Sequence, residues 1–148
     1  MNSKQASGLT IVGGLLMAVG SFLTWVAVTG DIADLITAQG EQASTTGIAG
    51  GDGWFSLVIG VVLVAVGYMA FSGKSVPGWL TPTAAVLGVA FVALEYFTNK
   101  SDIDDLNSLI SISGLDGSAG WAIGYWVVAA GSIVALVGAF MSRGKKTA

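Results

Sequence analysis

The sequence contains no cysteine and no histidine among its 148 residues. Without cysteine the chain has no disulfide, no thiolate metal site and no cysteine nucleophile. Without histidine it lacks the commonest metal ligand and the usual general base. No nucleophile–base pair, metal-ligand cluster or phosphate-binding glycine loop takes their place. The sequence therefore predicts a protein that is not an enzyme and that holds neither a metal nor a cofactor.

Charge is also scarce. Charged residues make up 10% of the chain and hydrophobic residues 53%, whereas a typical soluble domain has about 25% charged residues. Only six residues are basic, which is too few for a nucleic-acid-binding surface. The composition excludes a helical protein with polar faces turned to water, and it points to the lipid bilayer as the surroundings of most of the chain.

The uncharged residues gather in four long runs. Each run is long enough for a membrane-spanning helix, because about 20 helical residues cross a ~30 Å hydrocarbon core. We expect membrane-spanning helices at residues 8–28, 53–72, 79–98 and 120–141, joined by long loops at 29–52 and 99–119. The first run is longer than the core of a signal peptide, about 7–15 residues, so we expect it to be retained. The predicted fold is an all-α membrane protein, a single domain forming a four-transmembrane-helix bundle.

Two loop segments have weaker signals of their own. Residues 26–28 and 47–49 are candidates for a pair of short strands next to the spans. Residues 106–112 suit a short helix or a strand, and their periodicity does not decide between the two.

The basic residues divide unequally between the two sides of this arrangement. Five of the six fall on one side: Lys4, Lys74, Arg143, Lys145 and Lys146. The two long loops hold only Lys100 and, in or next to them, all nine acidic residues. Because cytoplasmic segments carry the excess of Lys and Arg, we expect both termini in the cytoplasm. The predicted location is the cytoplasmic membrane of a bacterium.

Glycines recur at seven-residue intervals within the predicted helices. In lipid, helices associate where small residues let their backbones approach, and a seven-residue spacing keeps those residues on one face. The candidate packing positions are Gly13, Gly20, Gly60, Gly67, Gly88, Gly124, Gly131 and Gly138. Two interpretations stay open: packing within this bundle, and a seam for a membrane-protein partner or a second copy of the chain.

The chain also has the pattern of a duplicated hairpin. Residues 8–72 and 79–142 each contain a span, a long loop and a second span. The second spans share one spacing, at Gly60/Gly67 and at Gly131/Gly138. Two hairpins of equal orientation would be related by a twofold axis along the membrane normal.

Tryptophans and one carboxylate mark the ends of the spans. Trp25, Trp54, Trp79 and Trp121 are candidate anchors at the membrane interface, where Trp is enriched. Glu95 is the only acidic residue within a predicted span. It is a candidate for interfacial anchoring or for contact with an ion or a partner. With no ionisable group deeper in the spans, a proton relay or coupled transporter has no supporting residues.

Two short motifs carry a family resemblance: Gly-Ser-Phe-Leu-Thr-Trp at residues 20–25 and Gly-Gly-Asp-Gly-Trp at residues 50–54. In these motifs the chain resembles a family of small uncharacterised four-span proteins of actinobacteria and their phages, in which proline usually stands at the position of Thr24. The resemblance implies a four-span topology and no particular activity. The layout is also similar to that of claudin-like four-span proteins, by topology alone and without their paired loop cysteines.

Together these features favour a non-enzymatic accessory or scaffolding subunit that interacts with other membrane proteins. Two alternatives stay open. One is a holin or exclusion protein of a phage or prophage, because holins are small and often end in a charged cytoplasmic tail. The other is an oligomeric pore or small-solute transporter.

Overall fold

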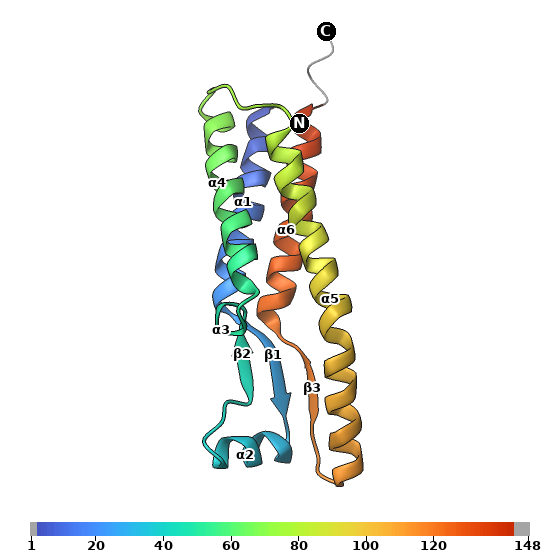
Figure 1. Cartoon of the computed structure of the whole chain (residues 1–148). Coiled ribbons are helices and arrows are strands. Elements are labelled where there is room, and N and C mark those ends of the chain that lie inside the picture. The colour runs from blue at the N-terminus through green and yellow to red at the C-terminus, as the bar shows by residue number, and fades with distance from the viewer. Residues whose placement is uncertain (1–2, 144–148) are drawn as a thin grey trace.

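A computed structural model describes residues 3–143, which form a bundle of four long helices that continues at one end into a small lobe containing a β-sheet (Figure 1). The elements in chain order are α1 (Ser3–Phe22), β1 (Thr24–Thr29), α2 (Asp31–Ala38), β2 (Ser44–Thr46), α3 (Gly47–Gly50), α4 (Gly53–Phe71), α5 (Leu80–Ser113), β3 (Ser118–Trp121) and α6 (Ile123–Arg143). Within the described residues four helices are long and apolar enough to cross a membrane: α1, α4, α5 and α6. The four long apolar helices predicted from the uncharged runs are therefore confirmed, whereas the predicted all-α class is wrong in that the chain also forms a three-stranded sheet.

The sheet lobe comprises the three strands, α2, α3 and the second half of α5. The turn end is the opposite end of the bundle, where residues 72–79 connect α4 to α5 and where α1 begins and α6 ends (Figure 1).

Helix α1 is the central element of the bundle, because it packs against both α4 and α6. Two consecutive glycines of α1 contact these helices, Gly13 facing α6 and Gly14 facing α4. A methyl group on Gly13 would lie 2.5 Å from the carbonyl oxygen of Gly131 in α6, and one on Gly14 would lie 2.6 Å from that of Gly60 in α4. Backbones this close leave no room for any side chain. The close approach brings many atoms of the two helices into van der Waals contact, and the resulting dispersion energy favours helix association without a hydrophobic driving force.

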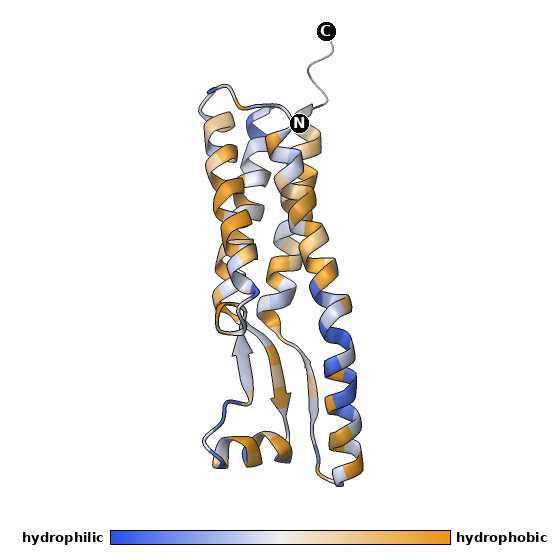
Figure 2. Ribbon diagram, in the orientation of Figure 1, coloured by the Kyte–Doolittle hydropathy of each residue, from blue (hydrophilic) through white to orange (hydrophobic). Residues whose placement is uncertain are grey.

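The interior of the bundle is filled by apolar side chains that are completely buried: Met17, Leu63, Ala85 and Val128. Buried hydroxyl groups are satisfied locally, as where Ser21 donates to the Met17 carbonyl and meets the Ser56 hydroxyl at 2.6 Å. In the described chain, no buried side-chain polar atom lacks a hydrogen-bond partner. The outer surface of the bundle is apolar as well (Figure 2).

The sheet lobe has the strand order β2-β1-β3, with both pairs antiparallel. Val26 in β1 faces Trp121 in β3 across the ladder, and Thr29 faces Ser118. The second half of α5 covers this sheet through Ile103 and Ile110, which pack on Ala119. One strand edge is completed by a side chain, because Asn107 exchanges two hydrogen bonds of 2.8 and 2.9 Å with the backbone of Ala119.

Several predicted boundaries are wrong because this lobe was not foreseen. The first span was predicted to reach residue 28, but α1 ends at Phe22 and the chain enters β1. The predicted loop 99–119 is largely helix, since α5 runs on to Ser113. Its buried residues at 103 and 110, with Asn107 between them, face the sheet. This packing stabilises the helical conformation of residues 106–112, for which periodicity alone did not decide between helix and strand.

The predicted pair of short strands is correct for one member. Residues 26–28 lie in β1, but residues 47–49 belong to the short helix α3, and the strand paired with β1 lies just before them at Ser44–Thr46.

The two predicted hairpins also pack differently. A twofold axis would turn the glycines of α4 toward α1 and those of α6 toward α5. In the structure Gly60 and Gly131 both face α1. The shared glycine spacing therefore reflects one common partner and not a structural repeat.

Candidate functional site

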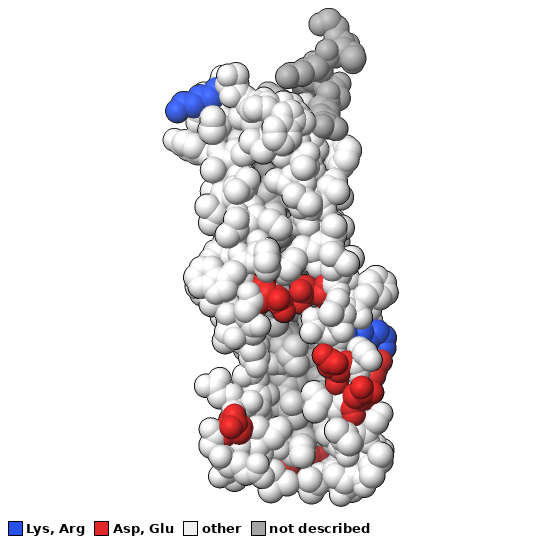
Figure 3. Space-filling model, in the orientation of Figure 1, with Lys and Arg blue, Asp and Glu red and all other residues white. Residues whose placement is uncertain are grey.

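A cleft of about 230 Å³ opens where the bundle meets the sheet lobe. It is bordered by β1, β2, the α3–α4 junction, α5 and β3, so elements from both halves of the sequence converge on it. Acidic side chains gather at this level of the surface (Figure 3). The residues that line it are Trp25, Val26, Thr45, Thr46, Gly47, Gly50, Asp52, Glu95, Asn99 and Trp121.

Two carboxylates face this cleft from different elements. Asp52 directly precedes α4, and Glu95 lies in α5, close enough for the charge of Asp52 to act on it. Asn99, one helical turn after Glu95, donates from Nδ2 to the Glu95 carboxylate at 2.9 Å. This amide orients one carboxylate but brings no positive charge.

No basic side chain neutralises these carboxylates in the described part of the chain. The one ion pair there joins Lys100 to Asp104, one turn apart on the exposed face of α5. Their hydrogen bond, aided by the charge of Asp104, raises the pKa of Lys100. The lysine nearest in sequence to Glu95 is therefore engaged elsewhere, and the cleft keeps its negative charge.

Indole rings form the walls of the cleft. Trp25 is 5% exposed and donates from Nε1 to the Gly20 carbonyl at 2.9 Å, which satisfies an acceptor at the end of α1. Trp121 stacks on Tyr125 with ring centroids 4.2 Å apart, and the Tyr125 hydroxyl donates to the Val92 carbonyl of α5. These contacts fix both indoles in place, so the cleft has rigid aromatic sides.

Two carboxylates in a cleft lined by indole side chains form an environment suited to an organic cation. A lysine ammonium or an arginine guanidinium could make charge-assisted hydrogen bonds to the carboxylates. Among the described residues no group of three or more Asp, Glu, His or Cys side chains is placed to hold a metal ion. The lining of the cleft therefore suits a lysine or arginine side chain better than a metal ion.

All eight glycines predicted as packing positions lie at contacts inside the bundle or at its junction with the lobe. Gly13 and Gly131 face each other across α1 and α6, and a methyl group on Gly138 would lie 2.7 Å from the Ala6 carbonyl. Gly88 is looser, since its nearest neighbour is the end of the flexible Met17 side chain at 3.1 Å. Gly20 of α1 meets Val128 and Gly124 of α6, and the remaining three glycines contact α1 or the residues just after it: Gly60, Gly67 and Gly124. These positions suit the interpretation of packing within the bundle.

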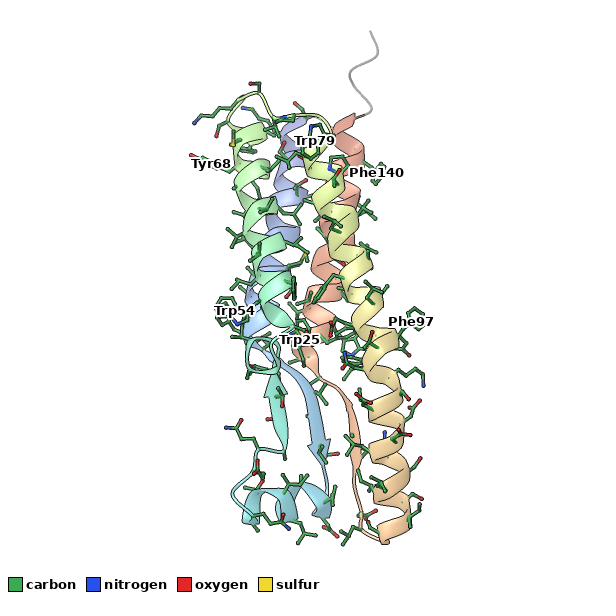
Figure 4. All side chains as sticks on the ribbon, viewed as in Figure 1. Trp25, Trp54, Tyr68, Trp79, Phe97 and Phe140 are labelled. Carbon is green, nitrogen blue, oxygen red and sulfur yellow. The ribbon has the colours of Figure 1, made fainter. Side chains whose placement is uncertain are left out.

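The four tryptophans have three different environments. Trp54 and Trp79 are 55% and 62% exposed, at opposite ends of the bundle, as expected of interface anchors (Figure 4). Trp121 is half-buried in the aromatic stack. Trp25 is wrongly predicted as an anchor: because α1 stops at Phe22, β1 turns the indole inward over the end of the bundle.

Sequence reasoning singled out Glu95 but missed its neighbours. Asp52 was counted only as a loop charge, and Asn99 was not considered. The spacing of Glu95 and Asn99, four residues apart on a helix, was a readable signal for their hydrogen bond. Their proximity to Asp52 was not readable, because it depends on α4 and α5 packing side by side.

No protein-family model matches the chain, and neither a curated protein nor a solved structure is significantly similar to it.

Proposed function

We propose that this is a multi-pass integral membrane protein whose four long helices cross a bilayer. Two groups of exposed aromatic side chains support this, because such residues gather at both membrane interfaces. Tyr68, Trp79 and Phe140 lie near the turn end, and Trp54 and Phe97 lie near the sheet lobe (Figure 4). Along α5, Trp79 and Phe97 are separated by about 27 Å of helix rise, close to a ~30 Å hydrocarbon core.

The proposed orientation places the turn end in the cytoplasm of a bacterium and the sheet lobe outside. The turn end carries Lys4 and Lys74 and no acidic residue, while the acidic side chains belong to the lobe and the cleft (Figure 3). The side chain of Arg143 and the whole of Lys145 and Lys146 lie outside the described residues, and their charges support the same orientation from the sequence alone.

In this setting the protein acts as a non-enzymatic accessory or scaffolding subunit, and the acidic cleft receives a basic side chain of a membrane-protein partner. The observation that carries this proposal is the pair Asp52 and Glu95, two carboxylates without a cationic partner between indole walls. A cationic side chain from another protein would supply the missing charge.

The double variant D52N/E95Q tests this role, since it keeps the shape of the cleft and removes its charge. Tagged protein is extracted in mild detergent from cells that produce the partner, and co-purified proteins are quantified by mass spectrometry. Removing one side of a desolvated charge pair costs about 2–5 kcal/mol, so we expect partner recovery to fall at least about tenfold.

The matched control is D102N/D105N, which removes two exposed acidic charges from α5 outside the cleft. Its partner recovery should equal that of the wild type. The particle size of the purified complex distinguishes a different protein from a second copy of this chain. A loss of recovery that is equal in both double variants would contradict a specific role of the cleft.

A second readout separates this role from membrane lysis. The buried hydroxyls of the described helices are hydrogen-bonded within the bundle, so no polar stripe remains to line a pore. We therefore expect that expression in a bacterial host leaves the dye-reported membrane potential unchanged. Rapid depolarisation on induction would favour the holin alternative.

A further inference from the structure

A second hollow, of about 620 Å³, lies at the turn end of the molecule, far along the bundle from the acidic cleft. It is enclosed by the start of α1, the connection between α4 and α5, the first turn of α5 and the end of α6. It is distinct from the cleft in both position and charge, and nothing in the proposed partner interaction requires it.

Three donors from the α4–α5 connection and the first turn of α5 border this hollow. Lys74 forms no ion pair within the described residues, and the hydroxyls of Ser75 and Thr81 make no hydrogen bond there. By contrast, the Ser7 and Ser142 hydroxyls on the opposite wall are already engaged, each donating to a carbonyl of its own helix. Three free donors therefore come from one segment, the α4–α5 connection and the start of α5, and the Ser3 hydroxyl of α1 borders the hollow as well.

The electrostatic surroundings favour an anion. None of the nine acidic residues lies at the turn end, so no Asp or Glu side chain of the described residues competes for these donors. Helix α5 is 34 residues long and begins at Leu80, beside the hollow. The first turn of a helix carries a partial positive charge that adds to the charge of Lys74.

The remaining wall of the hollow is apolar and level with the exposed aromatic residues. Ala70, Val76, Pro77 and Pro82 contribute this apolar surface. Trp79, which is 62% exposed, directly precedes α5 beside it. A hollow that offers both polar donors and apolar surface matches a headgroup whose acyl chains continue along the helices.

From this arrangement we propose that the turn-end hollow binds a phosphate-bearing anion, and that its source is the headgroup of an anionic phospholipid. Lys74 supplies the charge, and the hydroxyls of Ser75 and Thr81 donate to phosphate oxygens. Basic pockets between transmembrane helices on the cytoplasmic side recognise lipid phosphates in this manner. The inference goes beyond the accessory role, since it concerns the opposite end of the molecule.

Native mass spectrometry of the purified full chain in neutral detergent tests the proposal, with phosphatidylglycerol and phosphatidylcholine added at equal concentration. We expect preferential retention of phosphatidylglycerol. Lys74→Gln should weaken this retention about fivefold, since one lysine near an anionic lipid surface contributes about 1 kcal/mol. Thr81→Phe, which fills the hollow without changing charge, should also weaken it.

The matched control is Lys100→Gln, which removes the same charge at the sheet lobe and should leave lipid retention unchanged. Equal retention of the two lipids by the wild type, or equal losses in Lys74→Gln and Lys100→Gln, would overturn the proposal. Displacement of phosphatidylglycerol by millimolar inorganic phosphate would overturn the lipid as source and leave free phosphate as the ligand. All of these readouts are independent of the partner measured with D52N/E95Q.

Discussion

The helical bundle and the sheet lobe are stabilised in opposite ways. In the bundle, backbone meets backbone at glycines, and every charge is excluded from the interior. In the lobe, side chains such as Ile103 and Asn107 hold a helix against a small sheet, and charges remain on the surface. The difference shows that the bundle is constrained mainly by the size of its residues, whereas the lobe depends on specific side-chain contacts and keeps charged groups on its surface.

The largest effect is expected in a test of whether the sheet lobe and the turn end of the bundle lie on opposite sides of a membrane. The chain has no native cysteine, so single substitutions can be labelled without background. Cysteines at Ser44 and Ser108, both exposed in the lobe, should react fully with an impermeant maleimide in intact cells, and one at Ser75 should not react. Reaction of all three after lysis is the control. Labelling of Ser75 from outside would reverse the proposed orientation.

The next largest effect is expected where the backbones touch. Gly131→Leu places a side chain where a methyl group alone would lie 2.7 Å from the Gly13 carbonyl oxygen. Overpacking at such a contact costs about 3 kcal/mol or more, because two helices must separate. We expect the folded yield in detergent to collapse, as measured by size-exclusion chromatography.

Two control variants show whether size at the contact is the cause. Val137→Leu enlarges an exposed residue of the same helix α6 and should retain the folded yield. Gly8→Ala adds a methyl group in α1 where no atom lies within 4 Å, and it should be neutral. Equal sensitivity at Gly8 and Gly131 would remove the argument for a close-packed face.

A smaller effect is expected at the junction of the two regions. Trp25→Ala empties a buried site and removes one of the two donors to the Gly20 carbonyl, which keeps only the Leu23 backbone N–H, so we expect a loss of about 3 kcal/mol in the free energy of unfolding. The matched control is Trp79→Ala, at a residue that is 62% exposed. A denaturant titration in micelles should show little change for this control. Equal losses would mean that Trp25 acts as a surface anchor after all.

The fold of the bundle could be predicted because its cause is local. Four uncharged runs are long enough to cross a membrane, and the glycine spacing marks the faces where helices approach. The lobe could not be predicted from such signals. The helical course of residues 106–112 depends on Ile110 meeting Ala119, and the burial of Trp25 depends on where α1 ends.

The residues of the candidate site also differ in whether the sequence alone could identify them. Glu95 was identifiable because a carboxylate at the end of an apolar run is unusual in any sequence. Its partner Asp52 was hidden, since the two residues are far apart in the chain and meet only through the packing of α4 on α5.

The sequence by itself determined the composition of the interior, the number of long apolar helices and the unequal distribution of charge, because each depends on residue types counted along the chain. Only the tertiary structure decided which helix is central, that the long loops join in one sheet, and that two carboxylates share a cleft. These features arise from contacts between distant segments, and such contacts are selected by packing geometry, which no single segment contains.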